Sequence, residues 1–184
     1  MIAGQYGSLN IDSSGSWTYT VDNNLEAVQS LAAGEVLPDS IDVTSYDGTV
    51  QTIEITITGA DDTPLIEGGI GGVVTEDLSL TAHGTLTITD PDTGESSFQA
   101  VSGLTGLYGS LDIDSSGSWT YTVDNNLDAV QSLATGEVLP DSIDVTSYDG
   151  TVQTIEITIT GTNDGPVVLD TVSLLATEDT ALTI

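Results

Sequence analysis

The chain contains no lysine, no arginine and no cysteine among its 184 residues, whereas it has 29 aspartates and glutamates. An average soluble chain of this length carries on the order of 20 basic residues, so their absence is a strong signal. The formal net charge of -29 argues against nucleic acid and anionic membranes as partners, because both are bound through Lys and Arg. Multivalent cations are the partners that this composition favours.

Long apolar runs are also absent: none approaches the roughly 18 residues that span a bilayer. The lack of cysteine suits long surface proteins that are exported unfolded, although many cytosolic domains lack it too. High charge with few aromatics is typical of disordered chains. Disorder is disfavoured here because Val, Ile and Leu alternate with polar residues, as in half-buried strands.

The sequence repeats itself with a period of 102 residues. Residues 4–62 match residues 106–164 at 53 of 59 positions, and Thr75-Glu76-Asp77 recurs as Thr177-Glu178-Asp179. A period of this length is that of a domain, so each unit should have its own core. The predicted organisation is the C-terminal part of one repeat in 1–62, a complete repeat in 63–164 and the start of a third in 165–184.

The complete repeat has the pattern of an all-β domain. Five segments alternate apolar and polar residues and are predicted strands, namely 86–88, 111–113, 119–123, 143–145 and 155–159. A turn at 114–117 closes a hairpin, and Trp119 and Tyr121 share a face that should lie in the core. Residues 125–136 space apolar residues by three between Asn caps and a Gly, which predicts one short helix. About seven strands with Greek-key connections indicate an immunoglobulin-like or cadherin-like β-sandwich in tandem.

Three separate motifs in the complete repeat resemble the VCBS repeat family. They are Gly-Ser-Trp-Thr-Tyr-Thr-Val-Asp at 117–124, Ala-Val-Gln-Ser-Leu-Ala-Thr-Gly-Glu at 129–137 and Thr-Ile-Thr-Gly-Thr-Asn-Asp-Gly-Pro-Val at 158–167. The resemblance covers essentially the whole chain. It implies a spacer or adhesion module of a very large bacterial surface or RTX-type adhesin, placed outside the cell by type I secretion.

A looser similarity is to cadherin repeats, which bind calcium between domains. The residues that fall in corresponding order are Glu76, the pair Asp90 and Asp92 before Gly94, Asp149-Gly150, and Asn163-Asp164, with Glu137 as a stand-in for a further cadherin acid. Calcium takes six to eight hard oxygen ligands, and clustered carboxylates repel one another unless a cation lies among them. The similarity therefore implies calcium as the bound ion.

By this similarity each joint between repeats should form a calcium site. The first joint is assigned Glu35, Asp61, Asp62, Asp90, Asp92 and Asp149. The second is assigned Glu76, Glu137, Asn163 and Asp164, and it should be weak or partly filled because the sequence stops before the Asp-x-Asp pair of the third repeat. The alternative is that these segments are ordinary acidic turns.

Two further motifs are interpreted as structural. Asp112-Ile-Asp114-Ser-Ser116-Gly117 imitates the start of an EF-hand loop, but the twelfth position is Val123, so a hairpin turn is the better account. His83 precedes Gly84 and is interpreted as a turn residue. Paired carboxylates could hydrolyse glycosides, but the acids cluster in predicted turns. With one His and no Lys or Cys, we predict that the chain is not an enzyme.

Two functions remain in competition. Near-identical copies favour a structural spacer, stiffened by calcium and contacting neighbouring repeats of the same chain. The alternative is an adhesion module that binds a carbohydrate or a cell surface, which should show an exposed aromatic or apolar patch. The partial repeats at both ends also allow head-to-tail self-association by strand complementation.

Overall fold

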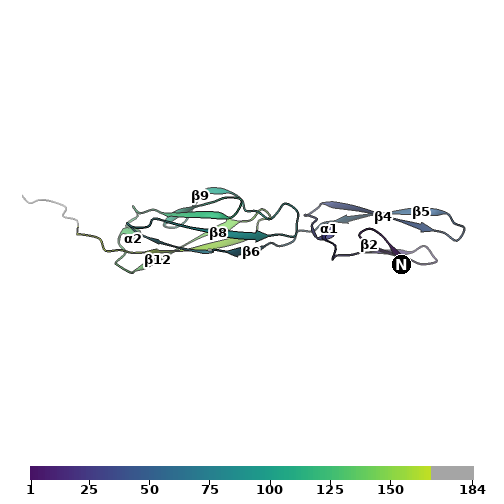
Figure 1. Cartoon of the computed structure of the whole chain (residues 1–184), viewed down its shortest axis with the longest axis horizontal. Helices are drawn as coiled ribbons and strands as arrows, with labels where there is room; N and C mark the ends of the chain where they lie inside the picture. Colours follow the sequence, from purple (N-terminus) through teal and green to yellow (C-terminus); the bar gives the residue numbers. More distant parts are fainter. Residues whose placement is uncertain (167–184) are drawn as a thin grey trace, which may run out of the picture.

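The computed structural model describes residues 1–166 and gives the chain the shape of a rod. Two β-sheet bodies follow one another end to end and are joined by a narrow connector (Figure 1). We call residues 1–60 the N-terminal part, 61–64 the connector and 65–160 the central sandwich. The segment predicted to open a third repeat lies, from residue 167 onward, outside the described residues.

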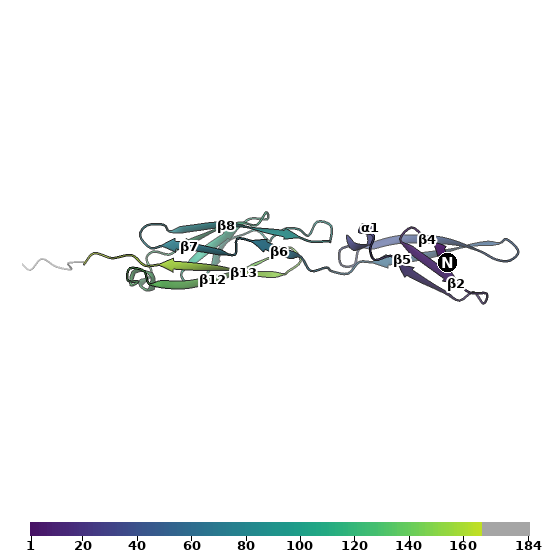
Figure 2. The same cartoon turned by 60° about the horizontal axis from the view of Figure 1, so that its bottom comes forward.

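The central sandwich consists of two packed sheets (Figure 2). The larger sheet has the order β6-β8-β11-β10-β9, and the smaller has the order β12-β13-β7. Strands β9 to β11 form a meander and β8 returns beside β11, which is a Greek key. The strands are β6 (Leu65–Gly68), β7 (Gly71–Thr75), β8 (Thr81–Thr89), β9 (Val101–Thr105), β10 (Gly109–Ile113), β11 (Ser118–Val123), β12 (Val138–Thr146) and β13 (Val152–Thr160).

The core lies between these sheets, as the alternating pattern predicts. Trp119 and Tyr121 on β11 are 1% and 0% exposed, and they belong to the same buried cluster as Ile155 and Ile157 of β13. The Trp119 indole N–H donates to the carbonyl of Gly69 at 2.9 Å, so the buried ring keeps its polar atom satisfied. The all-β sandwich predicted from the sequence is confirmed.

The N-terminal part repeats only the second half of this architecture. Its strands form a three-stranded sheet, β1-β2-β3, and a hairpin, β4-β5. Each residue of the central sandwich from 106 onward has an equivalent 102 positions earlier in the N-terminal part, which we call its twin. The twin of the buried Trp119 is Trp17, and it is 47% exposed. The elements are β1 (Ile2–Ala3), β2 (Gly7–Ile11), β3 (Trp17–Val21), α1 (Glu26–Gln29), β4 (Val36–Thr44) and β5 (Val50–Thr58).

A buried aspartate ties the sheets of the central sandwich together. Asp141 on β12 is 2% exposed, and its carboxylate accepts hydrogen bonds from the backbone N–H groups of Leu107, Tyr108 and Ser142. The Tyr121 hydroxyl donates to the same carboxylate at 2.8 Å. Four donors compensate the burial of this charge, so Asp141 fixes the turn before β10 to β12. Its twin Asp39 makes the same contacts in the N-terminal part.

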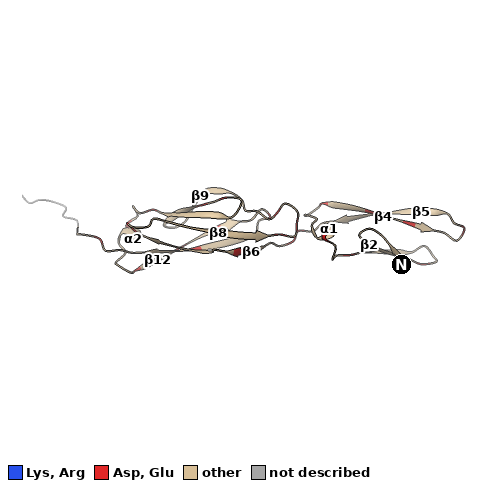
Figure 3. Ribbon diagram, in the orientation of Figure 1, with Lys and Arg blue, Asp and Glu red and all other residues tan. Residues whose placement is uncertain are grey.

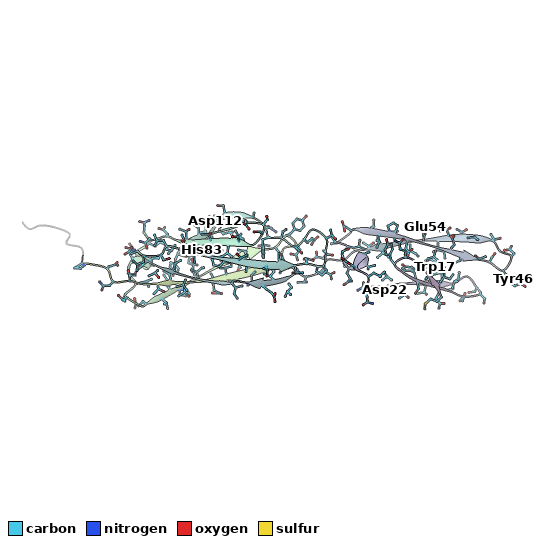
Figure 4. All side chains as sticks on the ribbon, viewed as in Figure 1. Trp17, Asp22, Tyr46, Glu54, His83 and Asp112 are labelled. Atoms are coloured by element: carbon cyan, nitrogen blue, oxygen red, sulfur yellow. The ribbon has the colours of Figure 1, made fainter. Side chains whose placement is uncertain are left out.

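The short helix predicted within residues 125–136 is confirmed, but two local details differ from the sequence-based expectation. The helix α2 (Asp128–Gln131) is only a single turn, and no side chain caps it. Asn125, interpreted as a cap, instead donates its side-chain N–H to Asp77 at 2.6 Å. His83 lies in the middle of β8 opposite Thr120 and is exposed, so it is a strand residue and not a turn residue (Figure 4).

The tyrosines bonded to the buried aspartates should make the fold sensitive to alkali. Burial, then the hydrogen bond and charge of Asp39, raises the pKa of Tyr19 to about 12, and burial with Asp141 raises the pKa of Tyr121 as well. Unfolded tyrosine titrates near pH 10, about two units lower. Stability should therefore be unchanged below about pH 10 and fall as the pH rises toward 12. In a pH titration followed by tyrosinate absorbance, Tyr19 and Tyr121 should ionise at a higher pH than the other tyrosines. These high-pH steps should disappear in Tyr19→Phe and Tyr121→Phe.

Candidate functional site: an acidic junction

The loop between β8 and β9 presents acids at the end of the central sandwich nearest the connector. It begins with Asp90, whose side chain accepts the backbone N–H of Asp92 at 2.9 Å, and the Ser96 hydroxyl accepts the N–H of Asp90 at 2.9 Å. Gly94 takes a φ of +90°, which reverses the chain and which L side chains rarely adopt. These contacts fix Asp90, Asp92 and Glu95 on one tight loop.

This loop is bonded across the connector. The backbone N–H of Asp62 donates to Asp92 Oδ2 at 2.8 Å. The N–H of Thr93 donates to the carbonyl of Ser30, in the N-terminal part, at 3.2 Å. The loop therefore touches the connector and the preceding body, and a change in its conformation would act on the angle between the two bodies.

Three carboxylates meet at this junction with no basic residue near them. One oxygen each from Asp61, Asp92 and Glu95 lies within 4.8 Å of the others. Asp90 and Asp92 are only 8% and 2% exposed, and the Asp90 Oδ2 and Asp92 Oδ1 atoms are buried without a hydrogen-bond partner among the described residues. A buried carboxylate oxygen without a partner is costly, so the site suits an ion that supplies the missing interaction.

Charge interactions show that two further acids, Asp90 and Asp149, belong to the cluster and bring it to five carboxylates. Burial, followed by the charges of Asp92, Asp149 and Asp61, raises the pKa of Asp90. Burial and the charge of Asp92, then those of Asp61, Asp90 and Asp149, raise the pKa of Glu95. Acidic residues occur along both bodies and the chain has no basic residue to offset them (Figure 3). A divalent cation would remove this repulsion, and an all-oxygen donor set fits calcium.

Asp149 approaches the cluster from the turn between β12 and β13. Burial raises the pKa of Asp149, but hydrogen bonds from Ser147 and Thr151 outweigh it and leave the pKa below its usual value. The Thr151 hydroxyl donates to Asp149 Oδ2 at 2.9 Å. Asp149 is therefore held as a charged carboxylate beside Asp90.

The structure differs in detail from the ligand set predicted for the first joint. It brings together Asp61, Asp90, Asp92 and Asp149, and it places Asp62 there through its backbone N–H. Glu35 is exposed, and its carboxylate accepts the N–H of Ala32 at 3.2 Å; no contact with the cluster is recorded within residues 1–166. Glu95 was missed. Its signal was its position, three residues beyond Asp92 on the same short loop, but the cadherin pattern gave it no role.

The residues predicted for the second joint lie at the far end of the central sandwich. Glu76 is fully buried, and its Oε1 accepts the Thr162 N–H at 2.7 Å, whereas Oε2 has no partner among the described residues. Glu137 is exposed and accepts the N–H of Ala134 at 2.8 Å. Asn163 and Asp164 are exposed. Sequence reasoning missed Asp77, which takes a positive φ of 59° beside Glu76.

The EF-hand-like segment forms a hairpin turn, as interpreted from the sequence. Asp114 accepts the N–H groups of Ser116 and Ser118 at 2.9 and 3.0 Å, which closes the turn between β10 and β11. Ile113, which lies between Asp112 and Asp114 at the end of β10, is 4% exposed, as an inward-facing strand residue should be. Asp112 accepts the Ser102 hydroxyl and the Gly103 N–H, so its carboxylate already has local partners.

Comparison with known proteins gives one family and several similar folds. The chain is similar to mouse clustered PcdhgC3 EC1-3 at 14% identity, with a TM-score of 0.47, over 83% of this chain and 50% of that one. It is similar to the human Desmocollin-1 ectodomain at 14% identity, with a TM-score of 0.35, over 90% of this chain and 31% of that one. The chain thus spans half or less of these structures.

Curated proteins gave no match to the chain. Among residues 1–166, no helix is long and apolar enough to cross a membrane. The family model that matches is the bacterial cadherin-like domain, over residues 61–161. This match spans the connector, the acidic loop and both sheets of the central sandwich. The chain belongs to the bacterial cadherin-like domain family.

Proposed function

We propose that the chain is a spacer of a bacterial surface adhesin, working outside the cell and stiffened by calcium bound at the junction between its two bodies. The observation that carries this proposal is the pair of buried oxygens without partners, Asp90 Oδ2 and Asp92 Oδ1, beside the carboxylates of Asp61 and Glu95. Acidic surface turns are common without an ion, but they are solvated. Here two of the carboxylates are almost completely buried.

Calcium at this position would strengthen a junction whose described links are the short connector and the hydrogen bonds of the acidic loop to Asp62 and Ser30. Asp61 belongs to the connector, Asp90, Asp92 and Glu95 to one loop, and Asp149 to a turn of the other sheet. An ion shared by these groups would fix the connector to the loop that contacts Ser30, and would in this way restrict the angle between the two bodies. The hydrogen bond from Thr93 to Ser30 would then be held in place.

Glu35 and the second joint remain predictions within this proposal. Glu35 would need to release the Ala32 N–H to reach an ion. At the far end, Glu76 Oε2 offers one buried oxygen near Asn163 and Asp164, with Glu137 on the adjoining turn, and acids from a following repeat would complete the site. We expect the second site to bind calcium more weakly than the first.

The resemblance to VCBS repeats supports the wider context of this proposal. It suggests a large type I secreted adhesin in which near-identical units add length, with no catalysis and with neighbouring repeats as the main protein partners. An adhesion module that binds a carbohydrate is the second candidate. Trp119 and Tyr121 are buried, whereas Tyr46 and Tyr148 are exposed in the turns after β4 and β12 and would be the aromatics available to a sugar. Binding of the chain to a glycan array would favour that candidate.

A calcium titration of matched variants tests the proposed site. Asp92→Asn removes a nearly buried ligand, whereas Asp144→Asn removes the same charge from an exposed residue whose side chain accepts a hydrogen bond from Thr154. Asp92→Asn should weaken calcium binding by about tenfold or more, since lost metal contacts cost at least that much. Asp144→Asn should bind calcium like the parent chain. Equal affinities in the two variants would mean that calcium binds only through net charge.

A further inference from the structure

The chain enters the central sandwich at one end and leaves it at the other. The connector leads into β6 at the end nearest the N-terminal part, and β13 ends on the side where the described C-terminal residues lie (Figure 1). A spacer that is anchored at one end and loaded at the other is pulled along this line. That tension acts on the chain rests on the proposed spacer role, whereas the way the fold would bear it follows from its strands.

The strands β7 and β13 lie side by side and run in the same direction, away from the connector (Figure 2). Their parallel register places Gly71 opposite Glu156 and Thr75 opposite Thr160. Tension on the connector draws β7 toward the N-terminal part, whereas tension beyond β13 draws that strand the opposite way. The pair is thus loaded in shear, so the evenly spaced hydrogen bonds between the strands must break together rather than one after another.

Hydrogen bonds beyond the strand lengthen this pairing on both sides. Before β7 begins, the N–H of Glu156 donates to the Ile70 carbonyl at 2.8 Å. After β7 ends, the N–H of Glu76 donates to the Thr160 carbonyl at 3.1 Å, and Glu76 Oε1 accepts the Thr162 N–H at 2.7 Å. We propose that β7 and β13 form a shear clamp that carries tension along the rod and keeps the central sandwich folded under load.

Core packing opposes the sliding of β7 in the direction of the pull. Val74 is fully buried, and a Cβ added at Gly72 would come within 2.8 Å of Ala82 and 3.1 Å of the Trp119 ring. A slip by one position would turn Val74 out of the core, because side chains alternate between the two faces of a strand. A further slip would carry Val74 into the place of Gly72, where a side chain does not fit. Both movements are opposed until the sheets separate.

A side-chain contact fastens the far end of β7 to another part of the sandwich. Asp77, just beyond the strand, has a φ of 59°, and its N–H donates to Asn125 Oδ1 at 3.1 Å. The Asn125 side chain donates back to Asp77 Oδ1 at 2.6 Å, and the Gln131 side chain donates to the same oxygen at 3.3 Å. Asn125 precedes α2 and Gln131 lies on it, so these bonds must break before β7 can slide.

Single-molecule unfolding with two directions of pull tests the clamp. The chain has no cysteine, so pairs of introduced cysteines define where the handles attach. Thr63→Cys with Gly165→Cys loads the central sandwich along its length, whereas Thr63→Cys with Val152→Cys places both handles at the connector end, where β13 begins. The lengthwise pull should need a several-fold higher force, since the other pull separates β7 from β13 one bond at a time. Equal forces in the two directions would overturn the proposal.

Matched asparagine variants test whether the resistance depends on β7. Asn125→Ala removes the hydrogen bonds to Asp77, whereas Asn126→Ala makes the same change at an exposed neighbour whose side chain donates to Asp124 at 3.2 Å. Forced unfolding follows the unfolding rate, so Asn125→Ala should lower the force of the lengthwise pull. It should leave the other pull unchanged, because the far end of β7 then separates last. Asn126→Ala should match the parent chain in both directions.

Two results with these variants would contradict the clamp. A loss of force in both directions for Asn125→Ala would indicate general destabilisation, and no loss in either direction would place the load on other strands. All measurements are made in EDTA, and the handle at Thr63 follows Asp61 and Asp62 in the connector, so that tension does not pass through them. A failed clamp therefore leaves the calcium proposal standing, and a chain that binds no calcium leaves the clamp standing.

Discussion

Chelation of calcium should lower the midpoint of thermal unfolding of the central sandwich by about 10 to 20 °C. Binding to the folded state alone at about 100 times the dissociation constant stabilises it by about 2.7 kcal/mol. For a domain of this size, 1 kcal/mol corresponds to roughly 4 to 8 °C. The change arises because calcium pairs with the buried oxygens of Asp90 and Asp92, which otherwise repel one another. Calorimetric scans in calcium and in EDTA measure it.

The control for this effect is a chain in which the acidic loop is neutralised. Asp90→Asn with Asp92→Asn should melt at nearly the same temperature in calcium and in EDTA. It should also melt above the parent chain in EDTA, because the repulsion among the carboxylates is reduced. A calcium effect of the parent size in this variant would place the stabilising ion elsewhere.

Asp141→Ala should be the most destabilising single substitution in the central sandwich that does not involve calcium. It would leave three backbone N–H groups and the Tyr121 hydroxyl without their acceptor in a buried site. Each buried donor left unpaired costs about 1 to 3 kcal/mol, so we expect a loss of about 3 to 5 kcal/mol after partial relaxation. Urea unfolding monitored by Trp fluorescence measures the loss.

Asp144→Ala is the matched control on the same strand. Asp144 is exposed and accepts one hydrogen bond, from the Thr154 hydroxyl at 2.6 Å, so its loss should change stability by no more than about 0.5 kcal/mol. If the two variants unfolded at the same urea concentration, Asp141 would have no special part in joining the sheets.

Much of the fold was predictable from sequence because its strands alternate polar and apolar residues. The hairpin of β10 and β11 and the long strands β12 and β13 carry regular alternation, and Trp119 and Tyr121 are buried as that pattern requires. The strand β7 was not identified, since its Gly-Gly-Val-Val-Thr sequence does not alternate. Of its two glycines, Gly72 is required by close packing, because a side chain there would come within 3.1 Å of the Trp119 ring.

Local signals failed where tertiary contacts compete with them. Asn125 has the properties of a helix cap, but its side chain forms hydrogen bonds with Asp77 instead. Asp77 has a left-handed backbone and lies more than 40 residues away in sequence, so no local pattern reveals this contact. His83 precedes a glycine, which suggested a turn. Gly84 instead provides space in a strand for the Trp119 ring, so the backbone continues through it.

The acidic junction was predictable only in part, because some of its residues follow a sequence pattern and others depend on tertiary contacts. Asp90, Asp92 and Asp61 follow a spacing pattern that the cadherin similarity identifies, and the structure brings them together. Glu95 was not singled out, because the cadherin pattern gives its position no role and because its proximity to the other acids depends on the turn that Gly94 makes. The burial of Asp90 and Asp92, which distinguishes a site from a solvated turn, depends on packing that no sequence spacing reveals.

A crystal structure of the chain grown with calcium, with anomalous scattering to identify the ion, tests the central claim most directly. The account predicts an ion at about 2.3 to 2.6 Å from Asp90 Oδ2 and Asp92 Oδ1, the usual distances for calcium. It also predicts that Asp61 and Glu95 lie in the same coordination sphere. An ion bound only at the Asp112–Asp114 turn, or a junction whose buried oxygens bond to nothing but water, would contradict it.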